Sequence, residues 1–253
     1  MPPLDPFVID LDGDGIELIS VEASNAHFDF MDDGFAERTG RLSGDDGFLL
    51  ADANGNGVVD GIGELFGSAT EDGFTELGRA DSNGDGLIDA NDAIFSSLRI
   101  WQDLNGDGVA TSDEISTLSD HGIVSIGVDG TRVSEYLVGN EIRYEGDVKL
   151  SDGTSLDSGA VFFARNTTLS KWIAPEGFAV DPATNDLPNI KGYGELKDLN
   201  AAMSLDSGLR AAVEALVDDA AGLSALPAKY RWQARMLNKR GFDHGITGTP
   251  ERV

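Results

Sequence analysis

The stretch DLNGDGVATSDE, residues 103–114 of this 253-residue chain, places acidic and amide side chains at a regular spacing. It has an acid or amide at positions 1, 3 and 5, glycine at position 6 and glutamate at position 12. Calcium prefers six to eight oxygen ligands, and such a loop supplies them from these side chains and the position-7 carbonyl. The predicted ligands are Asp103, Asn105, Asp107, the Val109 carbonyl and Glu114.

The same pattern occurs three more times towards the N-terminus. DSNGDGLIDAND is complete through position 12, with predicted ligands Asp81, Asn83, Asp85, the Leu87 carbonyl and Asp92. The four predicted loops span residues 10–22, 52–64, 81–92 and 103–114. A single match occurs often in turns, but four in little more than a hundred residues predict calcium as the cofactor.

The first two loops depart from the pattern. The Asp52 loop has its late acid at position 13, so the predicted set is Asp52, Asn54, Asn56, the Val58 carbonyl, Asp60 and Glu64. In the first loop, Asp10, Asp12 and Asp14 are expected to donate oxygens to an ion shared with another segment. The turns at 29–35 and 44–48 are either degenerate relatives of these loops or simple turns, and both interpretations stay open.

The charge of the chain is concentrated in its first half. Residues 1–120 hold 27 acidic and four basic residues, and residues 121–253 hold 18 and 14. The overall charge of -27 argues against nucleic-acid partners and anionic membrane surfaces and favours small cations. Acids that recur at fixed spacing favour metal binding over a halophile-type surface, and without metal the first half should fold poorly.

Several classes of protein are excluded by what the sequence lacks. There is no cysteine, and none of the GxSxG, HExxH or GxxxxGK[ST] motifs is present. His27, His121 and His244 lie in unrelated contexts and are interpreted as structural or surface residues. No apolar run is long enough for a membrane span and no N-terminal signal peptide is visible, so export would need another signal.

The hydrophobic pattern predicts an α+β fold. Short helices are expected beside EF-hand-like calcium loops, including one between the last two loops with Leu98 and Trp101 on its packing face. Alternating segments in 122–167 predict the antiparallel sheet on which the helices pack. The predicted organisation is a module over 1–173, a linker over 174–190 and a helical C-terminal tail over 191–253.

An Asp-Pro pair, Asp5-Pro6, lies shortly before the first loop. The apolar segment PFVI, which begins with Pro6 itself, leads from the pair to Asp10. The proline amide has lost much of its trans preference and has no N–H to hold it in a hydrogen bond. The Asp5 carboxyl can reach its own main-chain carbonyl, and such an intramolecular attack has a high effective molarity. Asp-Pro pairs are also ordinary turn formers, and Asp181-Pro182 serves as an internal control.

These segments together resemble a known family. DPFVIDLDGDGIE, FDFMDDGFAERTG, DDGFLLADANGNGVVDGIGELFG and the region from ADSNGDG to VFFARN are similar to the self-processing module of RTX-type proteins, such as the iron-regulated Frp proteins. The resemblance implies a secreted bacterial protein with calcium-triggered cleavage between Asp5 and Pro6 and a twisted amide. It further implies that the new C-terminal Asp is joined to a lysine amine of a neighbouring protein.

Two other functions compete with single-turnover self-processing. One is a calcium-stabilised structural or adhesive module without chemistry, which would have the same metal loops. The other is a dockerin-like protein-binding unit, suggested by the close spacing of the Asp81 and Asp103 loops. Cleavage would distinguish self-processing from a structural module. Calcium-dependent capture of a specific protein would indicate a dockerin-like unit.

Overall fold

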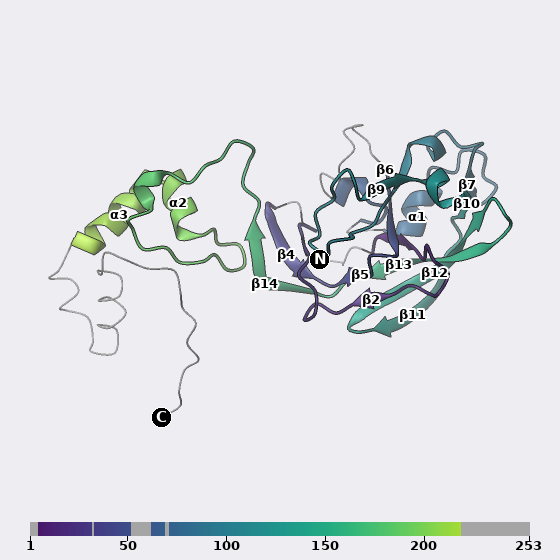
Figure 1. Ribbon diagram of the computed structural model, residues 1–253, viewed down its shortest axis with the longest axis horizontal. Helices are drawn as coiled ribbons and strands as arrows, with labels where there is room; N and C mark the ends of the chain where they lie inside the picture. The colour runs from purple at the N-terminus through teal and green to yellow at the C-terminus, as the bar shows by residue number, and fades with distance from the viewer. Residues whose placement is uncertain (1–4, 32, 52–61, 69–70, 219–253) are drawn as a thin grey trace, which may run out of the picture. The chain divides into compact units, whose positions relative to one another are not determined.

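The computed structural model describes residues 5–31, 33–51, 62–68 and 71–218 (Figure 1). The chain divides into two compact units, Met1–Ile173 and Ala174–Val253. Within the described residues, no helix is both long and apolar enough to span a bilayer.

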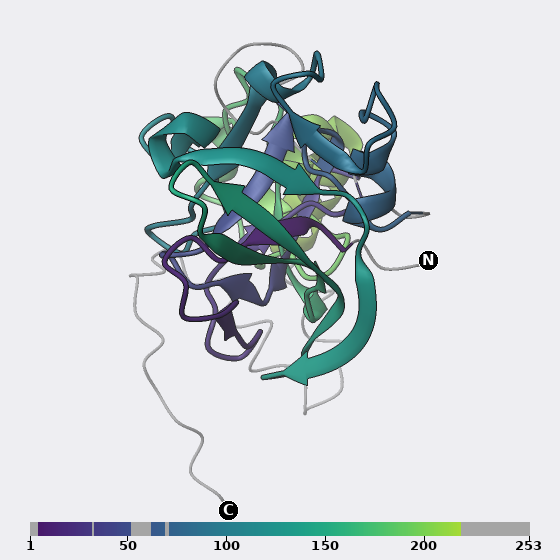
Figure 2. The same ribbon diagram turned by 90° about the vertical axis from the view of Figure 1, so that its right-hand side faces the viewer.

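The first unit is built on a nine-stranded antiparallel sheet that curls strongly, as Figure 2 shows. Its strand order is β7-β10-β12-β13-β1-β6-β8-β9, and β11 pairs with β12 outside this path. The strands are β1 (Phe7–Ile9), β6 (Gly47–Ala51), β7 (Leu87–Asp89), β8 (Leu98–Trp101), β9 (Ile115–Thr117), β10 (Ile123–Gly127), β11 (Thr131–Leu137), β12 (Asn140–Leu150) and β13 (Ser155–Phe162).

Strand β1 lies in the middle of this sheet, between β13 and β6. Because side chains alternate along a strand, Phe7 and Ile9 enter one hydrophobic core and Val8 enters the other. All three side chains are fully buried. A short strand held by two neighbours and two cores is a rigid element, and it connects Pro6 to Asp10.

Two smaller sheets complete the unit. One has the order β14-β4-β3 and the other pairs β2 with β5. Their strands are β2 (Leu18–Ile19), β3 (His27–Phe28), β4 (Phe35–Thr39), β5 (Arg41–Leu42) and β14 (Arg165–Trp172).

The predicted α+β fold with EF-hand-like helices is wrong, because the first unit is mostly antiparallel β-structure. Its helical elements are α1 (Gly73–Gly78) and the short 3-10 helices η1 (Ile62–Glu64), η2 (Phe95–Ser97) and η3 (Leu118–His121). The helix expected between the last two loops is only η2, after which Leu98–Trp101 forms β8. Leu98, Ile100 and Trp101 are buried in the sheet, so long-range strand pairing overrides their helical spacing.

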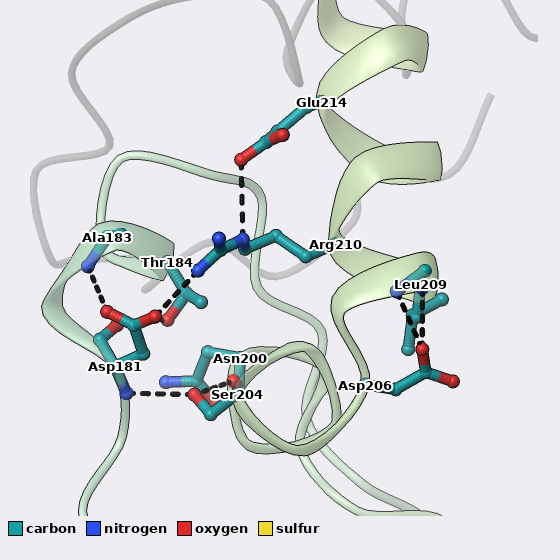
Figure 3. A network of polar contacts seen from close by, with 10 residues as sticks. Asp181, Ala183, Thr184, Asn200, Ser204, Asp206, Leu209, Arg210 and Glu214 are labelled. Carbon is teal, nitrogen blue, oxygen red and sulfur yellow. Dashed lines mark hydrogen bonds and ion pairs between the residues drawn. The ribbon is translucent and has the colours of Figure 1, made fainter.

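The second unit contains η4 (Pro182–Thr184), α2 (Leu199–Leu205) and α3 (Ser207–Asp218). Asp181 organises it (Figure 3): its main-chain N–H donates to Ser204 Oγ (2.8 Å), and its carboxylate pairs with Arg210 Nη1 (2.6 Å). Within the described residues of the predicted tail over 191–253, regular helix begins at Leu199. Residues 219–253 lie outside the described residues.

Candidate functional site

The two ends of β1 carry the two features singled out in the sequence. Asp5 and Pro6 directly precede the strand, and Asp10 directly follows it. Pairing extends past both ends: the Val161 N–H donates to the Pro6 carbonyl (3.1 Å) and the Asp10 N–H donates to the Asp157 carbonyl (3.0 Å). The Asp5-Pro6 junction and the first acidic loop are thus joined by three buried residues.

Asp5 is buried, with 4% of its surface exposed. Burial raises the pKa of its carboxyl to about 6, the Arg143 charge opposes this rise, and Asp72 adds to it. Arg143 Nη1 lies 3.6 Å from Asp5 Oδ2. A carboxyl with this pKa exists in both protonation states near neutral pH, as acid–base and nucleophilic chemistry requires.

Arg143 is itself held in place on β12. Its Nε lies 3.0 Å from Glu141 Oε2, and its guanidinium carbon is 4.9 Å from the centre of the Phe162 ring. Arginine stacks on aromatic faces while pairing with carboxylates, which fixes its orientation. Sequence reasoning missed Arg143, because its contact with Asp5 depends on strand order rather than on local spacing.

The peptide link between Asp5 and Pro6 packs against Gly67. A Cβ built on Gly67 would lie 2.5 Å from the Asp5 carbonyl oxygen and 3.1 Å from Pro6 Cα, and its φ of +121° also favours glycine. The Gly67 N–H donates to Glu76 Oε2 (2.8 Å), and the Phe7 N–H donates to the Phe66 carbonyl (2.8 Å). The link is therefore enclosed on the side of the Phe66–Gly67 backbone.

A small, partly open apolar pocket lies beside Pro6. Aromatic rings form much of its wall, and the Asp103 loop closes part of it through Asp103 and Gly108. The aromatic lining residues are Phe28, Phe30, Phe48, Trp101 and Phe163. Pro6 and a predicted metal loop thus contact the same pocket.

At the other end of β1, carboxylate oxygens of Asp10, Asp12 and Asp46 lie within 4.8 Å of one another, a group that could hold a metal ion. Asp46 is 1% exposed and accepts hydrogen bonds from the N–H groups of Leu11 (3.3 Å) and Glu17 (2.8 Å). Burial raises its pKa to about 7, against these two hydrogen bonds. A bound cation would favour the ionised form.

Asp46 was not among the predicted ligands. It directly precedes β6, whose Gly47 pairs with Ile9 of β1, and this register brings Asp46 beside Asp10. The sequence offered one indication of it, because the turn at 44–48, which contains Asp46, could be a degenerate relative of the calcium loops. The exposed Asp14 lies near Asp12, which raises the pKa of Asp14 through a side-chain hydrogen bond and charge repulsion.

The Asp81 loop folds around its first aspartate. Asp81 accepts hydrogen bonds from the N–H groups of Gly84 (2.7 Å) and Gly86 (2.9 Å). Asp92 is buried and accepts from the Ser82 N–H (2.8 Å), and backbone donors lower its pKa. Asn83, Asp85 and Leu87 are exposed along the loop, so positions 1 and 12 anchor it.

The Asp103 loop has the same arrangement with both ends buried. Asp103 accepts from the N–H groups of Gly106 (2.9 Å) and Gly108 (3.1 Å), and Glu114 accepts from those of Asn105 (3.3 Å) and Thr111 (3.2 Å). Burial raises the pKa of Asp103. Its other predicted ligands, Asn105, Asp107 and Val109, are exposed.

Two sets of residues remain, the predicted Asp52 loop and the three histidines interpreted as structural. Of the Asp52 loop, Asp52, Asn54, Asn56, Val58 and Asp60 lie outside the described residues, and Glu64 is buried at the end of η1. His27 Nδ1 is 2.8 Å from the Asn25 carbonyl and His121 Nε2 is 2.7 Å from Ser116 Oγ. His244 lies outside the described residues.

Comparison with known proteins gives two findings. Residues 7–164 match the family described as SPM domain. The iron-regulated protein FrpA of Neisseria meningitidis serogroup C is 37% identical over 215 residues, which cover 81% of this chain. The chain spans 19% of the length of that relative.

Proposed function

The chain belongs to the SPM domain family, and from this premise we propose that its first unit is a calcium-dependent self-processing module that cleaves the Asp5-Pro6 bond. The observation that carries the proposal is the environment of Asp5: a buried carboxyl with a raised pKa, beside an enclosed proline amide, one rigid strand away from a carboxylate cluster. The relation to FrpA, an RTX-family protein, supports it.

The chemistry needs only groups of the chain and water. A carboxylate oxygen of Asp5 attacks the Asp5 main-chain carbonyl carbon, and the bond to the Pro6 nitrogen breaks as that nitrogen takes a proton from water. The product is a five-membered cyclic anhydride at Asp5 and a new N-terminus at Pro6. Water opens the anhydride to a C-terminal Asp, or a lysine amine of a neighbouring protein opens it to an amide bond.

Residues of the chain position these atoms. Arg143 holds one carboxylate oxygen and Gly67 lets the Phe66–Gly67 backbone pack against the carbonyl. The burial of Asp5 keeps competing water away from the anhydride until it opens. A twist of the Asp5-Pro6 amide, which would remove its resonance protection, is part of the proposal.

Calcium is the proposed trigger. Asp10, Asp12 and Asp46 would hold one ion, and the Asp81 and Asp103 loops and the sequence around Asp52 would hold others. When bound, calcium supplies the positive charge that lets these carboxylates ionise while packed together. Asp10 is then fixed at one end of β1, and the rigid strand transmits this order to Pro6 at the other end.

The family also favours a place outside the cell for this module, where millimolar calcium is available. The second candidate function is a calcium-held structural module without cleavage. It is supported by the buried anchoring residues Asp92, Asp103 and Glu114, which stabilise their loops whatever happens at Asp5.

Intact mass spectrometry of the full chain tests the proposal. After incubation with millimolar calcium, we expect loss of residues 1–5 and a new N-terminus at Pro6, and no loss with a chelator. Asp5→Ala should stay whole, whereas the matched Asp181→Ala should be cut like the wild type. A wild-type mass that is unchanged after prolonged incubation with calcium would leave only the structural module.

A further inference from the structure

The short helix α1 packs directly on the strand that follows the Asp5-Pro6 link. A Cβ built on Gly73 would lie 2.9 Å from the Phe7 main-chain nitrogen, so the glycine lets the helix come this close. The Phe74 ring is buried, and its centre lies 4.6 Å from that of the Phe7 ring. Helix α1 is therefore held firmly against β1.

One side chain of α1 reaches from the helix to the backbone beside the link. Glu76 is half-buried, and its Oε2 accepts the Gly67 N–H at 2.8 Å. The two residues are nine positions apart in the chain, so the bond joins two separate segments. A hydrogen bond to a carboxylate is shorter and stronger than one between neutral groups, which makes this contact an effective tether.

Gly67 is the residue that packs against the link itself. A Cβ there would lie 2.5 Å from the Asp5 carbonyl oxygen and 2.8 Å from the carbonyl carbon, the atom that the Asp5 carboxylate would attack. An intramolecular attack depends on the angle at which the two groups are held, and a misplacement of about 1 Å can cost about a hundredfold in rate. The position of the Gly67 backbone therefore limits where the Asp5 carbonyl can lie.

The main chain next to Gly67 is held in a different way. The Phe66 carbonyl accepts the Phe7 N–H (2.8 Å), and both of these groups belong to the main chain. The bond from Gly67 to Glu76, in contrast, is made by a side chain. A substitution at Glu76 therefore alters the tether on Gly67 and removes no main-chain group.

We propose that Glu76 is a positioning residue for self-processing, which holds the Gly67 backbone against the Asp5 carbonyl through the Gly67 N–H. This inference rests on the proposed cleavage of the Asp5-Pro6 bond. The role requires a hydrogen-bond acceptor at the right reach, and it does not require the negative charge. Glutamine keeps the acceptor and loses the charge, whereas aspartate keeps the charge on a shorter side chain.

Cleavage rates of the full chain at saturating calcium test the proposal. Glu76→Asp withdraws the acceptor by one methylene and should slow the cut about tenfold or more. Glu76→Gln should be cut within about threefold of the wild-type rate, because a neutral acceptor weakens the hydrogen bond only about twofold. The calcium concentration for half-maximal rate should stay the same in both. Glu145→Asp makes the same change at an exposed position on β12 and should leave the rate unchanged.

A second readout does not depend on cleavage. In the uncut Asp5→Ala chain, amide hydrogen exchange at Gly67 should be about tenfold faster with Glu76→Asp than with Glu76→Gln, because the shorter side chain no longer holds the N–H. Thermal unfolding of the same chains shows whether each variant folds. If Glu76→Asp does not fold, Glu76→Ala takes its place with the same expected results.

The proposal is overturned if the folded Glu76→Asp chain is cut at the wild-type rate, or if Glu76→Gln is slowed as much as Glu76→Asp. It is also overturned if exchange at Gly67 is equal in the two variants. A shifted calcium midpoint with an unchanged maximal rate would place the effect of Glu76 on calcium binding and contradict the proposal. A wild-type chain that is never cut would instead refute self-processing, and this inference would fall with it.

Discussion

The chain contains two Asp-Pro pairs with loop-forming sequences around them, and their surroundings are opposite. Asp5 is buried, its Oδ2 lies 3.6 Å from Arg143 Nη1, and its pKa is raised to about 6. The Asp181 side chain is 40% exposed; Oδ1 accepts from the Ala183 N–H (2.9 Å) and Oδ2 pairs with Arg210 (2.6 Å) (Figure 3).

This difference separates a turn former from a candidate reactive bond. Asp181 caps η4, so both of its carboxylate oxygens are engaged with groups that follow it in the chain. Its own main-chain carbonyl accepts the Thr184 N–H (2.8 Å) and Thr184 Oγ1–H (2.8 Å). If Asp5-Pro6 is cut as proposed and Asp181-Pro182 is not, burial and close backbone packing are the features that distinguish the two pairs.

The largest effect on the calcium dependence of cleavage is expected at Asp46, which belongs to the cation cluster of the first unit. Asp46→Asn removes a charged ligand and should raise the calcium concentration needed for cleavage about tenfold or more. Burial raises the Asp46 pKa to about 7, so in the metal-free protein at pH 8 the ionised carboxylate is unfavourable where it lies. The neutral amide of Asn should therefore lower the unfolding free energy by no more than the loss of one hydrogen bond.

Cleavage measured against calcium concentration, together with thermal unfolding in chelator, tests this prediction. Glu145→Gln is the control, since Glu145 is an exposed acid on β12 outside the clustered group. An unchanged calcium midpoint in Asp46→Asn would show that the ion responsible for triggering binds elsewhere.

Gly67→Ala should make the surroundings of Asp5 less different from those of Asp181, because it disturbs the close backbone packing at Asp5. The new Cβ would meet the Asp5 carbonyl at 2.5 Å, so the backbone must shift, with an expected loss of about 2–4 kcal/mol in unfolding free energy. Gly153→Ala has a comparable φ of +90° and meets nothing within 4 Å, so it should lose only about 1–2 kcal/mol.

Denaturant unfolding of the Asp5→Ala chain isolates this stability effect from cleavage. In the chain with Asp5 present, Gly67→Ala should also slow the cut more than Gly153→Ala does. Equal behaviour of the two variants would mean that the packing at Gly67 is unimportant.

Arg143→Gln tests how far the Arg143 charge controls the pKa of the Asp5 carboxyl. The Arg143 charge opposes the rise in the Asp5 pKa, so its loss raises that pKa above about 6. Less of the attacking carboxylate is then present at pH 7, and we expect cleavage to slow several-fold there and its pH midpoint to move upwards. Cleavage rates from pH 5 to 9 measure this shift.

Arg143→Lys should restore part of the original profile, because it keeps the charge. Arg132→Gln, on the neighbouring strand β11, is the matched control and should leave the profile unchanged. A uniform slowing of Arg143→Gln at every pH would indicate a purely structural role.

The smallest effect is expected at Arg210, the partner of the other Asp-Pro pair. Arg210→Gln breaks partly exposed ion pairs with Asp181 and Glu214 and should cost only about 0.5 kcal/mol. No cut at Asp181 should follow, because the carboxylate still caps η4. Peptide masses after incubation with calcium test this, and a new cut at Asp181 would show that the dipeptide itself is reactive.

Local spacing was a good guide to single loops and a poor guide to their assembly. Asp81, Asp92, Asp103 and Glu114 each accept hydrogen bonds from the backbone of their own loops, and ion binding there stays a prediction. The segment 94–101 was predicted as helix from its apolar spacing. Its second half is β8, because pairing with β6 and β9 buries more apolar surface than an isolated short helix could.

The sequence by itself determined the acidic loops, the position of Asp5-Pro6 and the family resemblance, because these depend on residues close together in the chain. Only the tertiary structure placed Asp46 beside Asp10 and brought Arg143 and Gly67 to Asp5. The physical reason is that strand register and burial are set by pairing between distant segments. The same pairing buries the Asp5 and Asp46 carboxyls and thereby raises their pKa values, and no local sequence pattern encodes this pairing.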